Sequence, residues 1–543
     1  MRIRYRAGWF LVLFMTATAF AQQPPITKVD VCVYGGTASG VAAAVAVVHE
    51  GKSVILIEPG RHLGGMTTGG LGYTDFGNKA VIGGISRTFY KELGKVYRKD
   101  EVWTFEPHVA ENVFKQWVQE NNIKVLFEHR LQSLRKTGPR IVALTLEKAG
   151  VDDTGAPLPQ PTRRDAAFIE AAMYIDATYE GDLMAAANVT YTVGREAVEQ
   201  YGESLNGIRA KTPAHQFLLK VDPYLKPADP SSGLLPFIAT GDGGKPGGAD
   251  NSVQAYNFRL CLTQNPANRL PIAPPPAYDQ KRYELLARYL EALDAADKKP
   301  NLGMLLKIDM MPNGKTDINN NGAVSTDFIG QNYPYPDGDW PTRSRIWKNH
   351  QHYIRGLLHF LATSPRVPDN IRQDMSHWTL CRDEFTDTAG WPHQMYVREA
   401  RRMVGRYVIT QADCEHKRTC DDSIGMAAYN MDSHNCQRIV KNNTVENEGD
   451  VQVRPTGPYP VSYRAITPNE DQCDNLLVPV CLSATHIAYG SVRMEPVFMA
   501  LGESAARAAC AAIAQKTSVQ RIDIPTLTTK LQAAGQVLKY APR

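Results

Sequence analysis

An apolar strand, a glycine-rich turn and a helix follow one another in Val29-Asp-Val-Cys-Val-Tyr34, Gly35-Gly-Thr-Ala-Ser-Gly40 and Val41-Ala-Ala-Ala-Val-Ala-Val-Val-His49. Gly51 ends the helix, and a second apolar strand, Ser53-Val-Ile-Leu-Ile57, closes at Glu58. The order strand, turn, helix, strand predicts a complete βαβ unit near the start of the chain.

Such a unit is suited to a dinucleotide. The tight turn brings backbone N–H groups and the positive end of the helix to a pyrophosphate, and an acid closing the second strand accepts hydrogen bonds from ribose hydroxyls. As G-x-G-x-x-G, the turn has Thr37 where the middle glycine belongs; its side chain limits backbone approach, but its hydroxyl can donate to a phosphate oxygen. The predicted contacts are Gly35, Gly36, Thr37, Ala38, Ser39, Gly40 and Glu58.

A second glycine cluster separates FAD from NAD. Gly64-Gly65-Met66-Thr-Thr-Gly-Gly-Leu-Gly72 follows the ribose-binding strand. Flavoproteins run extended backbone past the adenosine and pyrophosphate here, whereas NAD enzymes generally lack the double glycine. A merely flexible loop is the alternative, but so many glycines fit close backbone approach to a ligand better. We therefore expect Gly64, Gly65 and Met66 to contact FAD.

Four segments together resemble the FAD-dependent oxidoreductase family found mainly in bacterial exported proteins: 35–40, 64–72, 176–187 and 483–496. The likeness runs from about Val29 to about Ala512. It implies an α/β fold, with a Rossmann-type, glutathione-reductase-like FAD domain and a discontinuous, mixed α+β substrate domain, and no single agreed substrate. Some members carry the label "xanthan lyase", although these motifs concern flavin binding.

The resemblance also implies further cofactor contacts. Backbone after the third strand, Lys124–Glu128, would contact the adenine at Arg130 or Leu131, of which we select Leu131. Thr178 follows the returning strand. A helix starting at Glu495-Pro496 would point its positive end at the flavin pyrimidine. The usual Gly-Asp for the ribitol is absent, so residues 490–495, with Glu495, take that role. No motif for covalent flavin attachment is evident.

His434, Asp432 and Arg493 are the catalytic candidates. A histidine beside Asp432 can take a proton from an alcohol or amine as hydride passes to flavin N5. A structural histidine is the alternative. Arg398, Arg401 and Arg402, in a predicted helix-to-strand run, favour a solvated or salt-bridged face.

The middle of the chain, rich in Pro, Trp, Tyr and Asn, is the expected substrate region, with helices over Tyr283–Ala295 and Ile346–Ala362. The stretch Lys315–Gly322 imitates the start of a calcium-binding loop whose first ligand would be Asp317. Counted from Asp317, the twelfth position is Phe328, where the loop needs a glutamate. An Asx-rich turn is therefore preferred and no metal is predicted. At Asp182, a cofactor-side role and a helix N-cap are equally good interpretations.

The predicted divisions are a signal peptide (1–21), the first part of the FAD domain (27–190), a substrate or cap domain (191–474), the FAD domain's C-terminal return (475–515) and a C-terminal tail (516–543). Beta-ribbon strands are expected over Leu131–Arg135, Ile141–Leu146 and Ala167–Ile175. A strand over 475–480 and a helix from Pro496 to Ile513 complete the return, with Gly502 allowing close packing on the first Rossmann helix.

Composition and targeting signals limit the partners. The chain is 43% apolar, and 60 Lys and Arg against 56 Asp and Glu leave a charge of +4 without long single-sign runs. We expect a small-molecule substrate, no nucleic acid, no stable membrane insertion and an unidentified electron acceptor. A basic start, an apolar run and an A-x-A site at Ala19–Ala21 predict export to the periplasm or medium, with an uncleaved anchor as the alternative. Of nine cysteines, Cys414 and Cys420 are the best local disulfide pair.

The expected function is FAD-dependent oxidation of a small polar substrate, carbohydrate-derived molecules included, by hydride transfer to flavin N5. A flavin-carrying binding protein without turnover and a polysaccharide lyase remain the alternatives.

Overall fold

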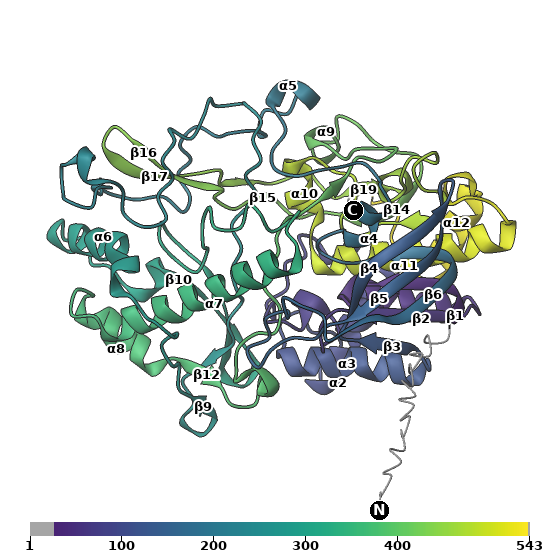
Figure 1. Ribbon diagram of the computed structural model, residues 1–543, viewed down its shortest axis with the longest axis horizontal. Coiled ribbons are helices and arrows are strands. Elements are labelled where there is room, and N and C mark those ends of the chain that lie inside the picture. The colour runs from purple at the N-terminus through teal and green to yellow at the C-terminus, as the bar shows by residue number, and fades with distance from the viewer. Residues whose placement is uncertain (1–25, 541–543) are drawn as a thin grey trace, which may run out of the picture.

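The computed structural model describes residues 26–540, so the predicted signal peptide and the last three residues lie outside it. A seven-stranded sheet organises the first part of the chain (Figure 1). Its strand order is β3-β2-β1-β6-β5-β4, and β20 also pairs with β6. The strands are β1 (Ile26–Tyr34), β2 (Val54–Glu58), β3 (Lys124–Phe127), β4 (His129–Thr137), β5 (Arg140–Lys148), β6 (Arg163–Asp176) and β20 (Leu476–Leu477).

The sheet confirms the predicted fold class. β3, β2, β1, β6 and β20 pair in parallel, whereas β4, β5 and the first half of β6 pair antiparallel as the predicted ribbon. The predicted ribbon strand ending at Ile175 and the returning strand are one element, β6. At 14 residues it is long enough to serve both roles.

Alternate residues of β1 face two different cores. Val31 and Val33 belong to the larger core, and Cys32 and Tyr34 to a smaller one, because successive strand side chains point to opposite faces. On the larger-core side, α1 (Ala38–His49) packs against α11 (Glu495–Gln515), with α2 (Gly84–Val96) and α3 (Pro107–Glu120) nearby.

Gly502 makes the contact between these helices as close as predicted. A Cβ there would lie 2.2 Å from the carbonyl oxygen of Ser39. By length and composition α11 could also cross a membrane, but 83% of its apolar window is buried inside the protein. Burial in the protein core therefore explains the apolar composition of α11.

The second large part of the molecule lies to the left in Figure 1. It contains a five-stranded sheet of order β10-β11-β8-β12-β9 and three helices. α7 starts six residues before the predicted Ile346 because the Asp339 side chain accepts a hydrogen bond from the Thr342 N–H and Pro341 fits the first turn. The bounds are β8 (Leu262–Thr263), β9 (Arg269–Leu270), β10 (Leu306–Met311), β11 (Lys315–Asn320), β12 (Thr379–Cys381), α6 (Glu284–Ala295), α7 (Trp340–Thr363) and α8 (Asp369–His377).

Two predictions in this part are wrong. The sequence from Lys315 is strand β11, paired antiparallel with β10, and Asx-turn geometry is excluded because Asp317 is buried in a bidentate ion pair with Arg259, at 2.6 and 2.7 Å. Arg398, Arg401 and Arg402 lie on no helix, so that part of the prediction is wrong; of the two predicted environments, the salt-bridged one is confirmed, since all three are buried and paired with carboxylates.

The remaining elements are shorter, apart from α12. The predicted C-terminal tail contains helix α12, which packs on α11. All nine cysteines are free thiols in this structure, Cys414 and Cys420 among them, so the predicted disulfide between these two stays a prediction. The bounds are α4 (Asp182–Ala186), β7 (Tyr191–Thr192), α5 (Val198–Tyr201), β13 (Arg402–Met403), α9 (Gln411–Cys414), β14 (Ser423–Ala427), β15 (Met431–Ser433), β16 (Gln437–Lys441), β17 (Thr444–Glu448), β18 (Val451–Val453), β19 (Tyr459–Ser462), α10 (His486–Val492) and α12 (Ile524–Ala533).

Candidate functional site

A cavity of about 980 Å³, including its open mouth, lies at the carboxyl ends of the parallel strands. Gly35 and Thr37 line it from the turn after β1, Glu58 from the end of β2 and Thr178 from just beyond β6. Ligands of open α/β sheets bind at this edge. The fold therefore brings these four predicted residues, distant in sequence, to one cavity.

The turn itself requires glycine at its two outer positions. Gly35 adopts φ +103°, which favours glycine, and a Cβ on Gly40 would lie 1.8 Å from the carbonyl oxygen of Gly35. The predicted tight turn is confirmed. Gly40 acts by packing, and it is not among the residues that line the cavity.

Thr37 has a different role from the predicted one. It is the N-cap of α1: its Oγ1 accepts a hydrogen bond from the Gly40 N–H at 3.2 Å and donates one to the Ala177 carbonyl at 2.7 Å. Because its only hydroxyl proton is used on Ala177, donation to a phosphate is not available in this arrangement. The substitution in the motif thus ties the first turn of α1 to the end of β6.

The N–H group of Ser39, in the first turn of α1, has no acceptor among residues 26–540, whereas the segment at Thr37 forms a parallel bridge with Gly64. Such groups form an anion-binding helix end. The Ser39 side chain and carbonyl group both face Gly502 on α11, and neither Ala38 nor Ser39 is among the residues that line the cavity. The Gly36 N–H, by contrast, is already donated to Glu58 Oε2 at 2.7 Å.

Glu58 closes β2 as predicted. Its two carboxylate oxygens accept hydrogen bonds from the Gly36 and Gly60 N–H groups, at 2.7 and 2.5 Å. Burial raises the pKa of this carboxyl to about 7, against the lowering effect of those two donors. Each oxygen keeps a further lone pair for a ribose hydroxyl.

The second glycine cluster packs around Tyr179. A Cβ on Gly65 would lie 2.4 Å from the Tyr179 hydroxyl, and that hydroxyl accepts a hydrogen bond from the Met66 N–H at 2.9 Å and donates one to Glu495 Oε1 at 2.7 Å. Thr67 donates to Glu495 Oε2 at 2.9 Å. Of this group, Gly65 and Tyr179 line the cavity.

Glu495, predicted to contact the ribitol, is not among the residues that line the cavity. Both of its oxygens accept hydrogen bonds from side chains of the chain itself, and burial raises its pKa to about 7. It joins the glycine-rich turn to the start of α11. Gly64 is likewise occupied by packing, since a Cβ there would meet Phe114 at 2.7 Å.

At the other end of the cavity, Arg130 and not Leu131 is the lining residue. The Leu131 N–H donates to the Tyr34 hydroxyl at 3.0 Å, which removes it from contact with a ligand. The Arg130 guanidinium lies 4.3 Å from the Trp340 ring and pairs with Glu147 at 2.6 Å. Neighbouring side chains of β4 point to opposite faces of the sheet. A shift of one residue therefore decides which of the two, Arg130 or Leu131, faces the cavity.

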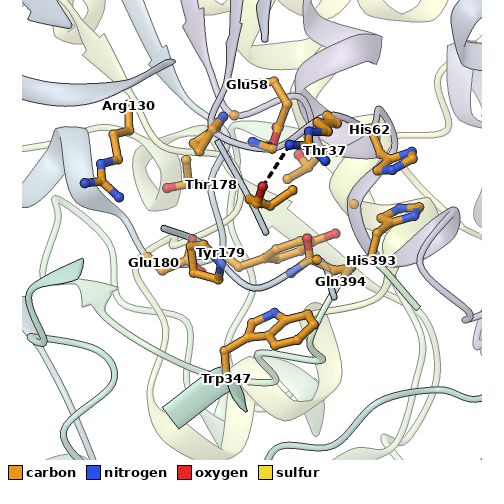
Figure 2. A pocket seen from close by; sticks show the side chains of 18 of the residues that line it. Thr37, Glu58, His62, Arg130, Thr178, Tyr179, Glu180, Trp347, His393 and Gln394 are labelled. Carbon is orange, nitrogen blue, oxygen red and sulfur yellow. Dashed lines mark hydrogen bonds between the residues drawn. The ribbon is translucent and has the colours of Figure 1, made fainter. Parts of the chain in front are cut away.

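Figure 2 shows the walls of the cavity: Glu58 and Thr37 lie on one side, Trp347 on the other, Arg130 at one end and the His62 and His393 pair at the opposite end. The two histidine rings stack at 3.9 Å. The sequence reasoning missed the wall from the second part of the chain; its excess of aromatic residues was the available signal. The missed residues are His62, Tyr179, Glu180, Tyr335, Trp340, Trp347, His393 and Gln394.

The cavity fits a dinucleotide. Five glycines line it and leave the backbone open to close approach: Gly35, Gly60, Gly65, Gly150 and Gly155. Nδ1 of His393, also in the wall, is buried without a hydrogen-bond partner in the described part of the chain, which is the condition of a group that expects a ligand.

The three catalytic candidates lie together, and none of them is among the residues that line the cavity. His434 Nε2 is 3.5 Å from Asp432 Oδ2, and Arg493 Nη2 is 3.2 Å from the same oxygen. The sequence reasoning missed the nearer partner, Asp327, whose Oδ2 lies 2.7 Å from His434 Nδ1. Asp327 in turn pairs with Arg398 at 2.9 Å.

Charges fix the protonation states within this cluster. Burial and Arg398 lower the pKa of His434, but Asp327 and Asp432 outweigh them, so that the pKa is raised above its ordinary value. Burial raises the pKa of Asp432, but His434 and Arg493 bring it down to about 2. The surrounding charges therefore shift His434 toward its protonated form and Asp432 toward its ionised form. Nε of Arg493 and Nε of Arg398 are buried without partners within residues 26–540.

Tyr396 connects the cluster to the cavity. Arg493 Nη1 donates to its hydroxyl at 3.1 Å, and the chain reaches the cavity wall two residues earlier, at Gln394. A Cβ on Gly69, in the second glycine cluster, would lie 2.4 Å from the Gln394 Cβ. The polar cluster is therefore joined to the cavity wall at Gln394 through Tyr396.

Of the two interpretations of Asp182, the N-cap is wrong, since it starts α4 after Gly181; it lines the cavity and pairs with Arg343 and Arg401. Glu106, His108 and Glu384 bring oxygen and nitrogen atoms close enough for a cation. The ammonium of Lys315 already lies 2.7 Å from both glutamates, so a lysine holds the place of a metal.

Comparison with known proteins supports one family. Residues 30–531 match the family described as FAD dependent oxidoreductase. None of the curated proteins is significantly similar to the chain.

Solved structures show weak likeness. They include anhydrotetracycline hydroxylase OxyS from Streptomyces rimosus (9% identity, 37% of this chain and 38% of that chain, TM-score 0.22), L-amino acid deaminase from Proteus vulgaris (13%, 31% and 52%, 0.23) and L-proline dehydrogenase from P. horikoshii (14%, 32% and 59%, 0.23). The match spans less than two thirds of each of these chains, and likenesses at this level carry no argument. The family match covers most of the sequence and includes both the cavity and the polar cluster: the chain belongs to the FAD-dependent oxidoreductase family.

Proposed function

We propose that this FAD-dependent oxidoreductase oxidises a small polar substrate, with carbohydrate-derived molecules as the first class to test, by hydride transfer to flavin N5. The observation that carries the proposal is the buried group of His434, Asp327, Asp432 and Arg493, which Tyr396 joins to the segment that lines the cavity at Gln394. A histidine held between two carboxylates and next to an arginine suits removal of a proton from an alcohol or amine.

The chain offers a contact for each part of FAD. Glu58 would accept hydrogen bonds from the ribose, the first turn of α1 would bind the pyrophosphate, and Arg130 with Trp340 would lie at the adenine end. Gly65 and Gln394 line the inner end. FAD bound there supplies the hydride acceptor, N5 of its ring system.

His434 would take the substrate proton at Nε2, since Nδ1 is held by Asp327. The imidazolium form must first lose a proton, so the rate would rise as pH rises through the raised pKa of His434. Asp432, ionised at any working pH, would orient the substrate and stabilise the imidazolium formed in the reaction. Arg493 fixes Asp432 and Tyr396.

An absorption spectrum of the purified protein, followed by anaerobic mixing with sugars, polyols and amines, tests the proposal. We expect flavin bands near those of free FAD, bleaching by at least one member of the panel, and strong slowing of that bleaching in His434→Gln. His377→Gln, at the end of α8, is the control. Bound flavin that nothing bleaches would favour a flavin-carrying binding protein. Unsaturated uronate products from flavin-free protein would favour a polysaccharide lyase.

We also propose export to the periplasm or medium, on the strength of the basic and apolar residues 1–21. Amino-terminal sequencing of protein recovered after expression with its own leader tests this, and a mature start at Gln22 is expected. The electron acceptor could then be identified by reoxidising reduced protein with oxygen or a quinone.

A further inference from the structure

Two cysteines in the second part of the chain face each other across a sheet. Cys261 Sγ and Cys381 Sγ lie 3.7 Å apart, although the residues are 120 positions apart in the chain. Both side chains are fully buried. Between residues 26 and 540, no other two cysteines form a hydrogen-bond contact through their sulfurs.

The strand register explains the approach. β12 pairs antiparallel with β8, with Leu380 opposite Leu262 and Thr379 opposite Thr263. Continuing that register by one residue brings Cys381 opposite Cys261. Directly opposite residues of an antiparallel pair have Cβ atoms about 4.5–5.5 Å apart, and a disulfide needs about 3.5–4.5 Å. A small adjustment of the side chains is sufficient.

The residues around these two thiols supply no other polar partner. Cys261 and Cys381 form a small apolar cluster of their own with Met311 and Phe385, and each sulfur's hydrogen-bond contact in the described structure is the other sulfur. The cluster lies outside the FAD cavity. A catalytic or metal-binding thiol pair would need access or further ligands, which buried apolar neighbours do not supply.

We propose that Cys261 and Cys381 form a disulfide bond when the chain folds in an oxidising environment. Two thiols would lose two protons and two electrons to form one S–S bond, and an oxidising disulfide, such as oxidised glutathione, would accept them and become two thiols. Burial raises the pKa of the Cys261 thiol, so exchange is slow once the chain is folded and the bond must form during folding.

The bond would hold one side of the FAD cavity. Cys381 is the last residue of β12, and the chain then runs through Glu384, paired with buried Lys315, to His393 and Gln394 in the cavity wall. On the other side, Arg259 lies two residues before Cys261, and a Cβ on Gly70 would lie 2.0 Å from its carbonyl oxygen. The disulfide would join the two segments that enclose the glycine-rich loop.

Counting thiols in the full chain tests the proposal. Protein refolded in a buffer of oxidised and reduced glutathione is denatured without reductant, treated with iodoacetamide and weighed by mass spectrometry. With nine cysteines in the sequence, the expected result is seven adducts, and nine adducts would overturn the proposal. Peptide mapping should find a linked pair that contains residues 261 and 381; a link between other cysteines would also overturn it.

Variants give a second and independent readout. Cys261→Ala with Cys381→Ala should take up seven adducts, which means that no disulfide remains; five would place the bond elsewhere. The control is Cys32→Ala, in the smaller core beside β1. It keeps eight cysteines, of which two would form the disulfide, so it should take up six adducts. If the double variant does not fold, peptide mapping of the unaltered chain still decides. Where it folds, its melting temperature should be lower than that of the oxidised wild type and close to that of wild type refolded with excess reductant.

Discussion

Replacing Glu58 by glutamine removes the charge from the residue that we expect to bind the ribose while keeping its size. In the structure its two oxygens accept hydrogen bonds from Gly36 and Gly60. Glutamine has one oxygen and one NH₂ group, so in either orientation a donor faces one of these two N–H groups. The variant therefore disturbs the turn as well as the contact with the ribose.

The expected loss follows from the number of charge-assisted hydrogen bonds. One such bond contributes roughly 1.5–3 kcal/mol, so losing the bond to the ribose alone weakens FAD binding by about 10- to 150-fold. The pKa of about 7 adds a pH dependence. If the ionised form binds, the ionised fraction rises from about a tenth at pH 6 to about nine tenths at pH 8, and wild-type affinity should rise roughly tenfold over that interval.

Titrating apoprotein with FAD and following flavin fluorescence, at several values between pH 6 and pH 8, measures both quantities. Glu58→Gln should bind more weakly and lose the pH dependence. Glu170→Gln, on the same sheet but paired with the exposed Lys28, is the matched control and should behave as wild type. Unchanged affinity in Glu58→Gln would refute the ribose contact. A pH dependence that persists in the variant would assign it to another carboxyl, of which Glu180, with a pKa also near 7, is the nearest candidate.

Three further perturbations follow from the geometry. Gly40→Ala should abolish FAD incorporation, seen as loss of absorbance at visible wavelengths in protein that is still folded by circular dichroism, because the new Cβ would collide with the Gly35 carbonyl; normal flavin content would contradict the assigned turn. Asp327→Asn should move the alkaline rise in kcat/KM to lower pH, since the carboxylate that raises the pKa of His434 is gone; an unmoved profile would exclude His434 as the titrating group. Lys315→Met leaves two buried carboxylates without their cation and should lower the stability to denaturant by about 3–5 kcal/mol, and an unchanged midpoint would argue against the buried network.

The local order of elements around the FAD site could be read from sequence because it depends on neighbouring residues. Strand alternation, the glycine turn, Glu58 at the end of β2 and Pro496 in the first turn of α11 are local features, and the structure contains each of them. The prediction was wrong in two kinds of place. A shift of one residue along a strand moves a side chain to the other face of the sheet, as between Leu131 and Arg130. In β11, burial in a sheet replaced the turn that the Asx-rich sequence predicted.

Hydrogen-bond partners could not be read in the same way. Thr37 matched a position in a phosphate-binding motif, but only the folded chain brings the Ala177 carbonyl to its hydroxyl. Glu495 was correctly placed at a helix start, yet its carboxylate is occupied by Thr67 and Tyr179, which come from two distant segments. Each side chain has few donors and acceptors, and tertiary contacts decide which are left for a ligand.

Sequence alone was sufficient for the βαβ unit at Val29, the FAD-type glycine loop and the helix that returns from the far end of the chain, because period, glycine position and capping are short-range properties. Tertiary structure added Asp327 beside His434, the aromatic and histidine wall opposite Glu58, and the approach of Cys261 to Cys381. These arise between residues tens to hundreds of positions apart. Short-range patterns carry no information about such pairs, since strand register and helix packing bring them together only when the chain folds.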